Sequence, residues 1–263
     1  MRFKEIMIAA LLLSLSGCDL QNRFIYFPGS AAPSQEVLKV RNLRLWQASA
    51  VDYRGVAAAD DRGGEKGTVV VFHGNGGIAA DRTFYLNDLG ALGFRVIIAE
   101  YPAYGGRSGE VGEKAFVRDA LETVRLAAGM YEGPFYILGE SLGCGVAAAV
   151  AAKTSVRIRG VILITPWDTL ASVAGAKFPL FPVRLFLTDR YDNIGNLRSF
   201  KGKIAVVGAE GDDIIPVSHA RKLYLSLPKT AGRMWVIRGA GHNDWPMRVN
   251  REWWREITDF VSA

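Results

Sequence analysis

The sequence is poor in cysteine and has no concentrated block of basic charge. Only two cysteines occur among its 263 residues, and Cys18 and Cys144 stand in such different contexts that we expect no disulfide between them. Lysine and arginine are scattered along the chain, so the formal charge of +6 does not indicate a nucleic-acid site. No internal repeat or low-complexity tract is visible. The length favours one large domain with a hydrophobic core over two smaller domains.

The N-terminus has the pattern of a signal peptide rather than of a membrane-spanning helix. Its apolar run, residues 6–15, is too short to span a bilayer well. The run follows Arg2 and Lys4 and precedes the tetrapeptide LSGC at 15–18. A positive start, a short apolar stretch and small residues before a cleavage site are typical of secretory signals. The tetrapeptide resembles a bacterial lipobox, in which the peptidase cuts before the cysteine and the cysteine is acylated.

From this resemblance we expect residues 1–17 to be a lipoprotein signal peptide, residues 18–35 a lipidated anchor and tether, and residues 36–263 the folded domain. Several acyl chains on Cys18 would give stable anchoring in a membrane. An ordinary secretory signal with an incidental cysteine is the alternative. Asp19 resembles the signal for inner-membrane retention in enterobacterial lipoproteins. We therefore expect a lipid-anchored protein of the bacterial cell envelope, on the periplasmic face of the inner membrane.

Two further segments have an unusual apolar character. Residues 24–29 read FIYFPG, and we expect them to pack on the edge of the domain. A segment so close to the lipid could also rest at the membrane interface. Residues 166–200 are apolar and broken by prolines, and we interpret them as a small cap that either lines the substrate pocket or packs on an edge. We interpret DRYD at 189–192 as surface or hinge.

Short apolar runs alternate with helical patterns along the rest of the chain. Continuous apolar runs are typical of strands buried on both faces, and apolar residues at helical spacing indicate helices. The expected strands are residues 42–50, 51–58, 68–72, 96–99, 135–138, 161–164, 204–208 and 234–237, and the expected helices are residues 79–92, 113–128, 146–152, 217–227 and 244–261. The first two strands are expected to form a hairpin or two edge strands. The alternation predicts an α/β fold with a parallel sheet covered by helices on both faces.

A serine in a sharp strand-to-helix turn is the candidate nucleophile. The pentapeptide GESLG at 139–143 lies between the apolar run 135–138 and the alanine-rich run 146–152. This order lifts Ser141 to the top of a parallel sheet and has the G-x-S-x-G pattern of a nucleophile elbow. Side chains at the glycine positions would crowd the turn. A plain glycine-rich connection is the alternative, and Cys144 is interpreted as a small buried residue.

A serine hydroxyl is a weak nucleophile and needs a base within hydrogen-bond reach. His242 lies in a loop directly after the last expected strand, where parallel sheets build their sites, and it is the candidate base. The loop after the preceding strand offers Glu210, Asp212 and Asp213 as the acid that fixes the imidazole tautomer. We choose Asp212, with Asp213 second, and expect the other carboxylates to be solvated or to cap the loop.

Backbone N–H groups near the serine would stabilise the oxyanion that forms during acyl transfer. One is expected from Leu142, the residue after the nucleophile, and the other from Asn75, in the loop after strand 68–72. Glycines on both sides of Asn75 let this backbone approach a substrate closely. We expect His73 to order the loop by hydrogen bonding, and we assign His219 to the start of a helix rather than to the site.

Taken in order, these motifs resemble the α/β-hydrolase superfamily. They are HGNGG at 73–77, the loop 101–109, GESLG at 139–143, GAEGDDIIP at 208–216 and GAGHND at 239–244. The sequence is most similar to the prolyl-oligopeptidase-like bacterial branch, akin to eukaryotic α/β-hydrolase-domain proteins that include protein depalmitoylases. The resemblance implies a mostly parallel eight-stranded sheet, a triad of Ser141, His242 and Asp212, and no metal or organic cofactor. An extra glycine before Asp212 leaves the choice between Asp212 and Asp213 open.

The sequence therefore predicts a membrane-anchored serine hydrolase that cleaves carboxylic esters or thioesters through an acyl-enzyme on Ser141. A serine peptidase of the same fold is the second reading, and the lack of a propeller or large gating domain speaks against an oligopeptidase. A non-catalytic envelope lipoprotein that binds a lipid or protein partner is the third, and the intact set of catalytic groups speaks against it. We expect a monomer whose partners are a small-molecule ester or acyl substrate and, through Cys18, the membrane.

Overall fold

A computed structural model describes the part of the chain that forms the domain. The described residues are 21–22, 25–29, 31–49, 52–60, 64–180, 182 and 187–263. The predicted signal peptide at 1–17, the predicted lipidation site Cys18 and Asp19 lie outside these residues, and what we expect of them stays a prediction. Within the described residues, no helix combines the length and the apolar character needed to cross a membrane.

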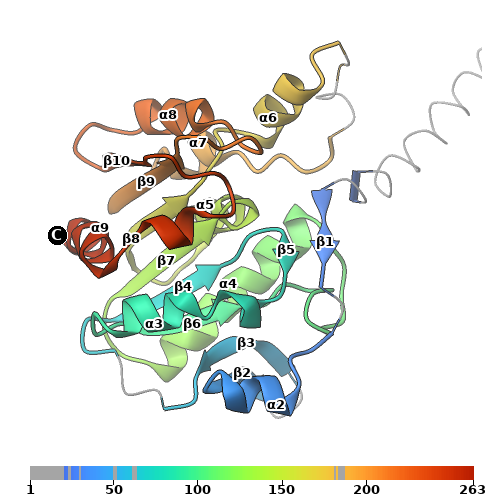
Figure 1. The fold of residues 1–263 in the computed structure, drawn as a ribbon, viewed down its shortest axis with the longest axis vertical. Coiled ribbons are helices and arrows are strands. Elements are labelled where there is room, and N and C mark those ends of the chain that lie inside the picture. The colour runs from blue at the N-terminus through green and yellow to red at the C-terminus, as the bar shows by residue number, and fades with distance from the viewer. Residues whose placement is uncertain are drawn as a thin grey trace, which may run out of the picture.

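The centre of the molecule is a twisted eight-stranded sheet (Figure 1). Its strands are β2 (Leu43–Ser49), β3 (Asp52–Ala58), β4 (Thr68–Phe72), β6 (Arg95–Ala99), β7 (Phe135–Glu140), β8 (Ile158–Ile164), β9 (Lys203–Ala209) and β10 (Gly232–Ile237). Their spatial order is β10-β9-β8-β7-β4-β6-β3-β2. The pairs from β10 to β6 are parallel, whereas β3 pairs antiparallel with both β6 and β2. The predicted mostly parallel eight-stranded sheet and the hairpin at its edge are confirmed.

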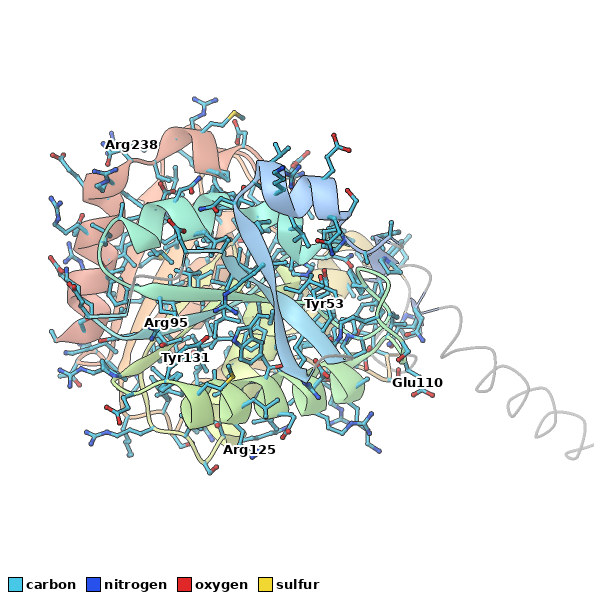
Figure 2. The ribbon with its side chains drawn as sticks, turned by 90° about the horizontal axis from the view of Figure 1, so that it is seen from below. Tyr53, Arg95, Glu110, Arg125, Tyr131 and Arg238 are labelled. Carbon is cyan, nitrogen blue, oxygen red and sulfur yellow. The ribbon has the colours of Figure 1, made fainter. Side chains whose placement is uncertain are left out.

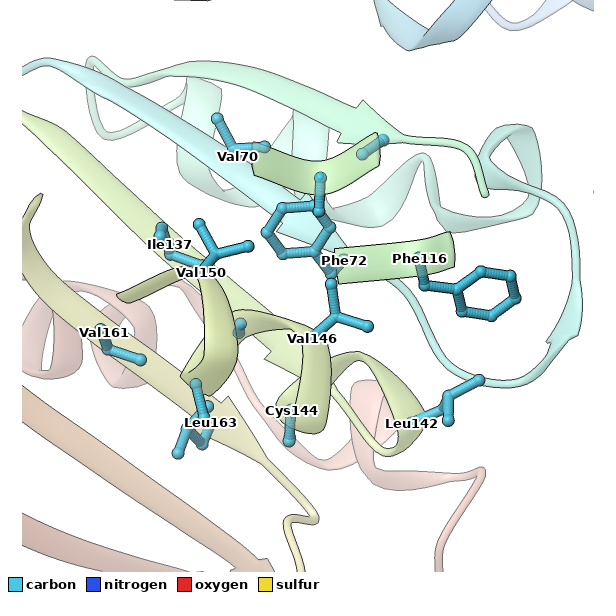
Figure 3. Close-up of a cluster of buried hydrophobic side chains, with 14 of the residues drawn as sticks. Val70, Phe72, Phe116, Ile137, Leu142, Cys144, Val146, Val150, Val161 and Leu163 are labelled. Carbon is cyan, nitrogen blue, oxygen red and sulfur yellow. The ribbon is translucent and has the colours of Figure 1, made fainter. Parts of the chain in front are cut away.

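Helices cover both faces of the sheet. They are α2 (Gln35–Val40), α3 (Phe84–Gly90), α4 (Glu113–Met130), α5 (Leu142–Lys153), α6 (Leu170–Lys177), α7 (Asn193–Leu197), α8 (Val217–Ser226) and α9 (Arg251–Ser262), with the 3-10 turns η1 (Ala79–Arg82) and η3 (Trp245–Arg248). One buried cluster includes Phe116 of α4 and Val146 of α5, and Figure 3 shows part of it around Phe72. A second cluster, on the other face, includes Leu38 of α2 and Trp254 of α9.

Strand β4 shows why the central strands are apolar without alternation. Val70 and Phe72 belong to the first buried cluster, while Val69 and Val71 belong to the second. Successive side chains of a strand point to opposite faces, so both faces of β4 are buried and the positions after Thr68 are apolar. Phe72, the last residue of β4, lies level with Gly139 near the end of β7. The neighbouring strands therefore end together, at the edge that carries the candidate site.

Two expected helices are interrupted in the structure, so those two predictions are wrong in detail. The stretch 79–92 divides into η1 and α3, because the side chain of Asp81 closes a separate first turn. The stretch 244–261 divides into η3, which has a proline in its first turn, and α9. Asn250 starts α9 as its N-cap, since its side chain accepts a hydrogen bond of 2.9 Å from the N–H of Trp253.

The cap predicted at 166–200 contains α6 and α7 in its described part. The prediction that 189–192 are surface or hinge is wrong for Tyr191, which is fully buried. The Tyr191 ring packs against α5 at Gly145, where a Cβ would lie 2.4 Å from the ring. The hydroxyl of Tyr191 lies 3.0 Å from the hydroxyl of Tyr26. A tyrosine in a polar run can therefore be buried, because its hydroxyl finds a partner inside.

A second, two-stranded sheet lies beside the main one. It pairs β1 (Phe27–Pro28) with β5 (Gly76–Gly77) in parallel, and Figure 1 shows the two strands side by side. The prediction that residues 24–29 pack on the edge of the domain is confirmed for Tyr26, which is buried. Phe27 is 57% exposed. The segment after the predicted anchor is thus packed on the domain, with one aromatic side chain turned outward.

At the end of the sheet where the parallel strands begin, β6 contacts the end of α4. The guanidinium of Arg95, the first residue of β6, lies 4.1 Å from the centre of the Tyr131 ring. Figure 2 shows these two side chains together. A cation over an aromatic face is an attractive contact, so it fixes the end of α4 at the edge away from the candidate site.

Candidate active site

Ser141 stands in a strained turn between β7 and α5. Its backbone φ is +52°, in the left-handed region that residues other than glycine rarely adopt. Its N–H donates a hydrogen bond of 2.9 Å to the carbonyl of Ile164. A Cβ on Gly139 would lie 2.5 Å from the carbonyl oxygen of Gly143, and a Cβ on Gly143 would lie 1.9 Å from that of Phe72. Only glycine fits at these two positions, as the elbow pattern predicts.

Three side chains from three strand ends form one hydrogen-bonded row. The Nε2 atom of His242 lies 2.9 Å from the hydroxyl oxygen of Ser141, and its Nδ1 atom lies 2.7 Å from Oδ2 of Asp212. Ser141 follows β7, Asp212 follows β9 and His242 follows β10. The carboxyl ends of parallel strands meet at one edge, which brings together residues as far as 101 positions apart. Such a row can take the proton from a serine hydroxyl.

Asp212, and not Asp213, is the carboxylate that contacts His242. Its Oδ1 atom accepts hydrogen bonds from the N–H groups of Ile214 at 3.0 Å and Ile215 at 2.7 Å. These two bonds fix the carboxylate and leave Oδ2 directed at the imidazole. Asp213, one position later in the same loop, is exposed.

Two other acids organise the loop that carries His242. The carboxylate of Glu210 accepts a hydrogen bond of 2.9 Å from the N–H of Gly239, which is the loop-capping role expected for a carboxylate of that segment. Asp244 accepts a hydrogen bond of 2.5 Å from the N–H of Gly241. This backbone bond lowers the pKa of Asp244 below its usual value. The backbone just before His242 is therefore held by two side-chain acceptors.

The two residues expected to supply oxyanion N–H groups line the same cavity as the serine. Leu142 is the first residue of α5, a position where a helix leaves the N–H without an intrahelical acceptor. Asn75 lies between β4 and β5, and its side chain is engaged away from the reacting centre. Its Oδ1 atom accepts from the N–H of Phe27 at 3.0 Å and from the hydroxyl of Tyr104 at 2.9 Å, and its Nδ2 group donates to the carbonyl of Ile25.

A buried histidine and a buried glutamate lie beneath the Asn75 loop. Nδ1 of His73 lies 2.7 Å from the carbonyl oxygen of Gly74, and Nε2 lies 3.0 Å from Oε1 of Glu100. Glu100 also accepts a hydrogen bond of 2.8 Å from the N–H of Ala79. The ordering role expected of His73 is confirmed by these bonds. Glu100 was missed, and its one signal is an acidic side chain directly after an apolar strand run.

Glu140, the residue before the candidate nucleophile, was also missed, since the elbow pattern treats it as a variable position. Its carboxylate accepts hydrogen bonds from the hydroxyl of Tyr85 at 2.7 Å and from Nε of Arg82 at 3.3 Å. Burial, and then the charge of Glu140, raises the pKa of Tyr85 well above its usual value, so that hydroxyl stays a donor. Arg82 also donates to the carbonyl of Gly76 at 3.1 Å. Glu140 thereby joins the elbow to η1 and to the Asn75 loop.

A cavity of about 630 Å³ opens beside Ser141 and His242. Its apolar wall comes partly from the cap and partly from the neighbouring loops, and consists of Ile25, Phe27, Leu142, Trp167, Leu170, Val173, Ile214 and Ile215. The cap thus lines the pocket, which was one of its two expected roles. The charged residues of the wall are Arg82, Glu140 and Lys177. A mostly apolar wall with a few polar groups is typical of a small-molecule site.

His219 lies outside this cavity, in α8, where its Nδ1 atom is 2.6 Å from Oδ1 of the buried Asp168. Lys222 pairs with the same carboxylate. Burial by itself raises the pKa of Asp168, but hydrogen bonds from Lys222 and His219 outweigh it and hold this pKa below its usual value. The cluster joins the cap to α8. Across the described ranges, no three His, Cys, Asp or Glu side chains are grouped as a metal ion would require.

Two sequence comparisons decide the family. A family model described as alpha/beta hydrolase fold matches residues 67–200. An uncharacterized protein of Mycobacterium tuberculosis is 30% identical over 231 residues, which cover 85% of this chain and 81% of that relative. The chain belongs to the α/β-hydrolase fold family. Membership supports a hydrolase function of the esterase or lipase kind for this α/β hydrolase.

Other similarities of this α/β hydrolase are more distant. Lysophosphatidylserine lipase ABHD12 of Bos taurus is 27% identical over 179 residues, which cover 59% of this chain and 44% of the lipase. A solved esterase of Pyrococcus furiosus has a TM-score of 0.67 at 16% identity, covering 90% of this chain and 98% of its own. A monoacylglycerol lipase of Paleococcus ferrophilus has a TM-score of 0.56 at 19% identity, covering 76% and 95%. At such identities the solved structures support the fold alone.

Proposed function

We propose that this α/β hydrolase is a serine hydrolase that cleaves carboxylic esters or thioesters through an acyl-enzyme on Ser141. The observation that carries the proposal is the hydrogen-bonded row, with 2.9 Å between Ser141 and His242 and 2.7 Å between His242 and Asp212. A serine becomes an effective nucleophile when a base lies within hydrogen-bond reach and a third group orients that base. Both requirements are met by side chains of one chain.

In the first half of the reaction, Oγ of Ser141 attacks the carbonyl carbon of the substrate while Nε2 of His242 takes the hydroxyl proton. The carbonyl oxygen becomes an oxyanion, which accepts hydrogen bonds from the backbone N–H groups of Asn75 and Leu142. The intermediate then collapses, the bond to the alcohol or thiol breaks, and His242 gives its proton to that leaving group. The acyl group stays on Ser141 as an ester.

In the second half, water replaces the leaving group. His242 takes a proton from the water as its oxygen attacks the acyl carbon, and it returns the proton to Oγ of Ser141 when the carboxylic acid departs. Asp212 stays ionised throughout. Its contact with Nδ1 selects the imidazole tautomer that leaves Nε2 free to accept, and its charge stabilises the imidazolium that forms in each half.

The apolar wall of the cavity favours a substrate with an acyl chain over a charged peptide. Trp167, Leu170 and Val173 of the cap contribute to this wall. A related protein is named a lysophosphatidylserine lipase, and two structures of the same fold are named an esterase and a monoacylglycerol lipase. These names favour ester cleavage over peptide cleavage. The expected likeness to α/β-hydrolase-domain proteins that include depalmitoylases keeps thioesters within the proposed substrate class.

The proposal extends to a lipid anchor. Residues 1–17 would be removed as a signal peptide, Cys18 would be acylated, and residues 36–263 would act as the hydrolase domain on the periplasmic face of the bacterial inner membrane. The support for this is the LSGC tetrapeptide after a short apolar run, followed by Asp19. We propose that the protein acts as a monomer, because one chain supplies the whole hydrogen-bonded row.

Labelling of the native protein with a fluorophosphonate tests the chemistry. We expect covalent labelling at Ser141, and we expect Ser141→Ala to lose both the label and roughly 10⁶-fold in turnover of a nitrophenyl ester. Ser218→Ala, at an exposed serine of α8, is the matched control and should keep both. Native protein that takes no label would favour the non-catalytic lipoprotein.

Metabolic palmitate labelling tests the anchor. Labelling that survives Cys18→Ser would contradict it.

A further inference from the structure

Large apolar residues are exposed around the mouth of the cavity. Phe27 and Ile214 line the cavity and are 57% and 39% exposed. Phe178 is 58% exposed and Leu180 is 100% exposed, and both follow Lys177, which lines the same cavity. Three residues of chain span at most about 11 Å, so the Cα of Leu180 lies within that distance of the Cα of Lys177. We call Phe27, Phe178, Leu180 and Ile214 the apolar rim.

Two segments next to or carrying residues of the apolar rim lie on the same side of the view in Figure 1. In Figure 1, β1, which carries Phe27, and the end of α6, which precedes Phe178, both lie toward the right of the view. The other large exposed apolar residues are Val40, Met130, Leu225 and Met247. Met130 ends α4 and Leu225 lies near the end of α8, and both helices run back from the edge that carries the site. Contiguous exposed apolar surface marks an interaction site, whereas single exposed residues need no explanation.

Gln21, close in sequence to the predicted lipidation site, is bonded to the cap. Gln21 comes three positions after Cys18 and is 8% exposed. Its side-chain NH2 group donates to the carboxylate of Asp189 at 2.8 Å, and its side-chain carbonyl oxygen accepts from the backbone N–H of Thr188 at 2.7 Å. The hydroxyl of Tyr26 donates to the same Asp189 carboxylate at 2.5 Å. Acyl chains on Cys18 would therefore attach within about 11 Å of Gln21, which is bonded to Thr188 and Asp189 of the cap.

We propose that the apolar rim docks on the surface of the bilayer that holds the acyl chains of Cys18, and that the enzyme takes acyl esters directly from this bilayer. The inference rests on the proposed function, an anchored serine hydrolase. Exposed aromatic and aliphatic side chains bind at membrane interfaces through the apolar area they bury. Lys177 beside the cavity offers a positive charge to anionic head groups. An acyl chain that leaves a docked bilayer meets the apolar wall of the cavity without crossing water.

The full-length lipoprotein, reconstituted in phosphatidylethanolamine–phosphatidylglycerol vesicles, tests the proposal. Two substrates are compared, a water-soluble short-chain nitrophenyl ester and a long-chain acyl ester embedded in the vesicles. We expect the double variant Phe178→Glu, Leu180→Glu to hydrolyse the embedded ester at least about tenfold more slowly, because charges at the rim oppose insertion. It should hydrolyse the soluble ester at the wild-type rate, since neither residue lines the cavity. Met130→Glu with Leu225→Glu is the matched control and should leave both rates unchanged.

A second readout reports orientation without relying on activity. Leu180→Trp should show added fluorescence that brominated lipids quench, and Leu225→Trp, near the end of α8, should not. Equal quenching at both positions, or a rim variant whose rate relative to the wild type is the same for both substrates, would overturn the proposal. So would a dimer in sedimentation that the rim variant dissociates, because the rim would then bind a second copy. If wild-type protein neither hydrolyses the soluble ester nor labels at Ser141, the proposed function fails instead.

Discussion

The N–H of Phe27 donates a hydrogen bond of 3.0 Å to the side-chain carbonyl oxygen of Asn75. The hydroxyl of Tyr104 donates to the same oxygen at 2.9 Å, and the Asn75 amide donates to the carbonyl of Ile25. One side chain therefore ties the loop after β4 to the segment that follows the predicted anchor. The backbone of that loop is the part expected to hold the oxyanion, so its precision depends on contacts made outside the reacting centre.

We predict that Asn75→Ala lowers kcat about tenfold and changes KM little, because the backbone N–H remains but is less well held. This loss should be smaller than the 10²- to 10³-fold typical of removing an oxyanion donor altogether. Steady-state kinetics with a soluble nitrophenyl ester separates the two constants. Tyr104→Phe, which keeps the ring and removes one of the two donors to Asn75, should have a milder effect of the same kind. A rise in KM with kcat unchanged would instead show that Asn75 binds substrate.

The assignment of the acid predicts a large difference between two adjacent aspartates. Asp212→Asn should lower kcat by about 10⁴-fold, because the amide no longer selects the productive imidazole tautomer. The fold should survive, since the amide oxygen of the new side chain can still accept from the N–H groups of Ile214 and Ile215. Asp213→Asn is the matched control and should keep wild-type activity, because this residue is exposed. If a turnover assay showed the larger loss for Asp213→Asn, the triad acid would be Asp213 and not Asp212.

The lowered pKa of Asp168 predicts that this carboxylate contributes to stability in a pH-dependent way. Its pKa is lowered in the folded protein, so its contribution is complete above its pKa in the unfolded chain, about 3.9, and is lost as pH falls through the lower folded value. Asp168→Asn should reduce the free energy of unfolding by about 1.5–3 kcal/mol at pH 7, the usual worth of hydrogen bonds to a charged group. Urea unfolding should show this difference shrinking as pH falls below about 4. A difference that stays constant with pH would point to packing and not to the charge.

The main features of the fold and the candidate site could be predicted because they depend on local patterns. After Thr68 the run to Phe72 is apolar at each position, as a strand buried on both faces requires. The elbow at Ser141 is specified by the glycines that flank it, and the position of His242 by a loop directly after the last strand. Each of these signals lies within a few residues of the feature it predicts.

What sequence reasoning missed depends on contacts between distant segments. Gln21 and Asp189 are 168 positions apart, and nothing local in either predicts that they bond. Tyr191 lies in a polar run, yet it is buried because Gly145 on α5 leaves room for its ring. The role of Glu100 could not be predicted for the same reason, since its partner His73 lies at the end of another strand. Polar residues of this kind are placed by tertiary hydrogen bonds, which hydrophobic periodicity does not record.

Two glycines in helices give opposite predictions for one substitution. Alanine is the better helix former by about 1 kcal/mol, so propensity alone predicts that Gly→Ala stabilises either helix. Gly129 in α4 has open space where a Cβ would go, and Gly129→Ala should raise the free energy of unfolding by about 0.5–1 kcal/mol. Gly143 in α5 has no such space, because a Cβ there would lie 1.9 Å from the carbonyl oxygen of Phe72.

We therefore expect Gly143→Ala to lose more than about 4 kcal/mol of stability, or to fail to fold, because neither backbone can move without disturbing the elbow. Urea unfolding followed by circular dichroism measures both variants under the same conditions. The nucleophile turn also depends on this close approach, so any folded Gly143→Ala protein should react slowly with the fluorophosphonate. A Gly143→Ala protein as stable and as reactive as Gly129→Ala would show that α5 does not pack directly on the end of β4.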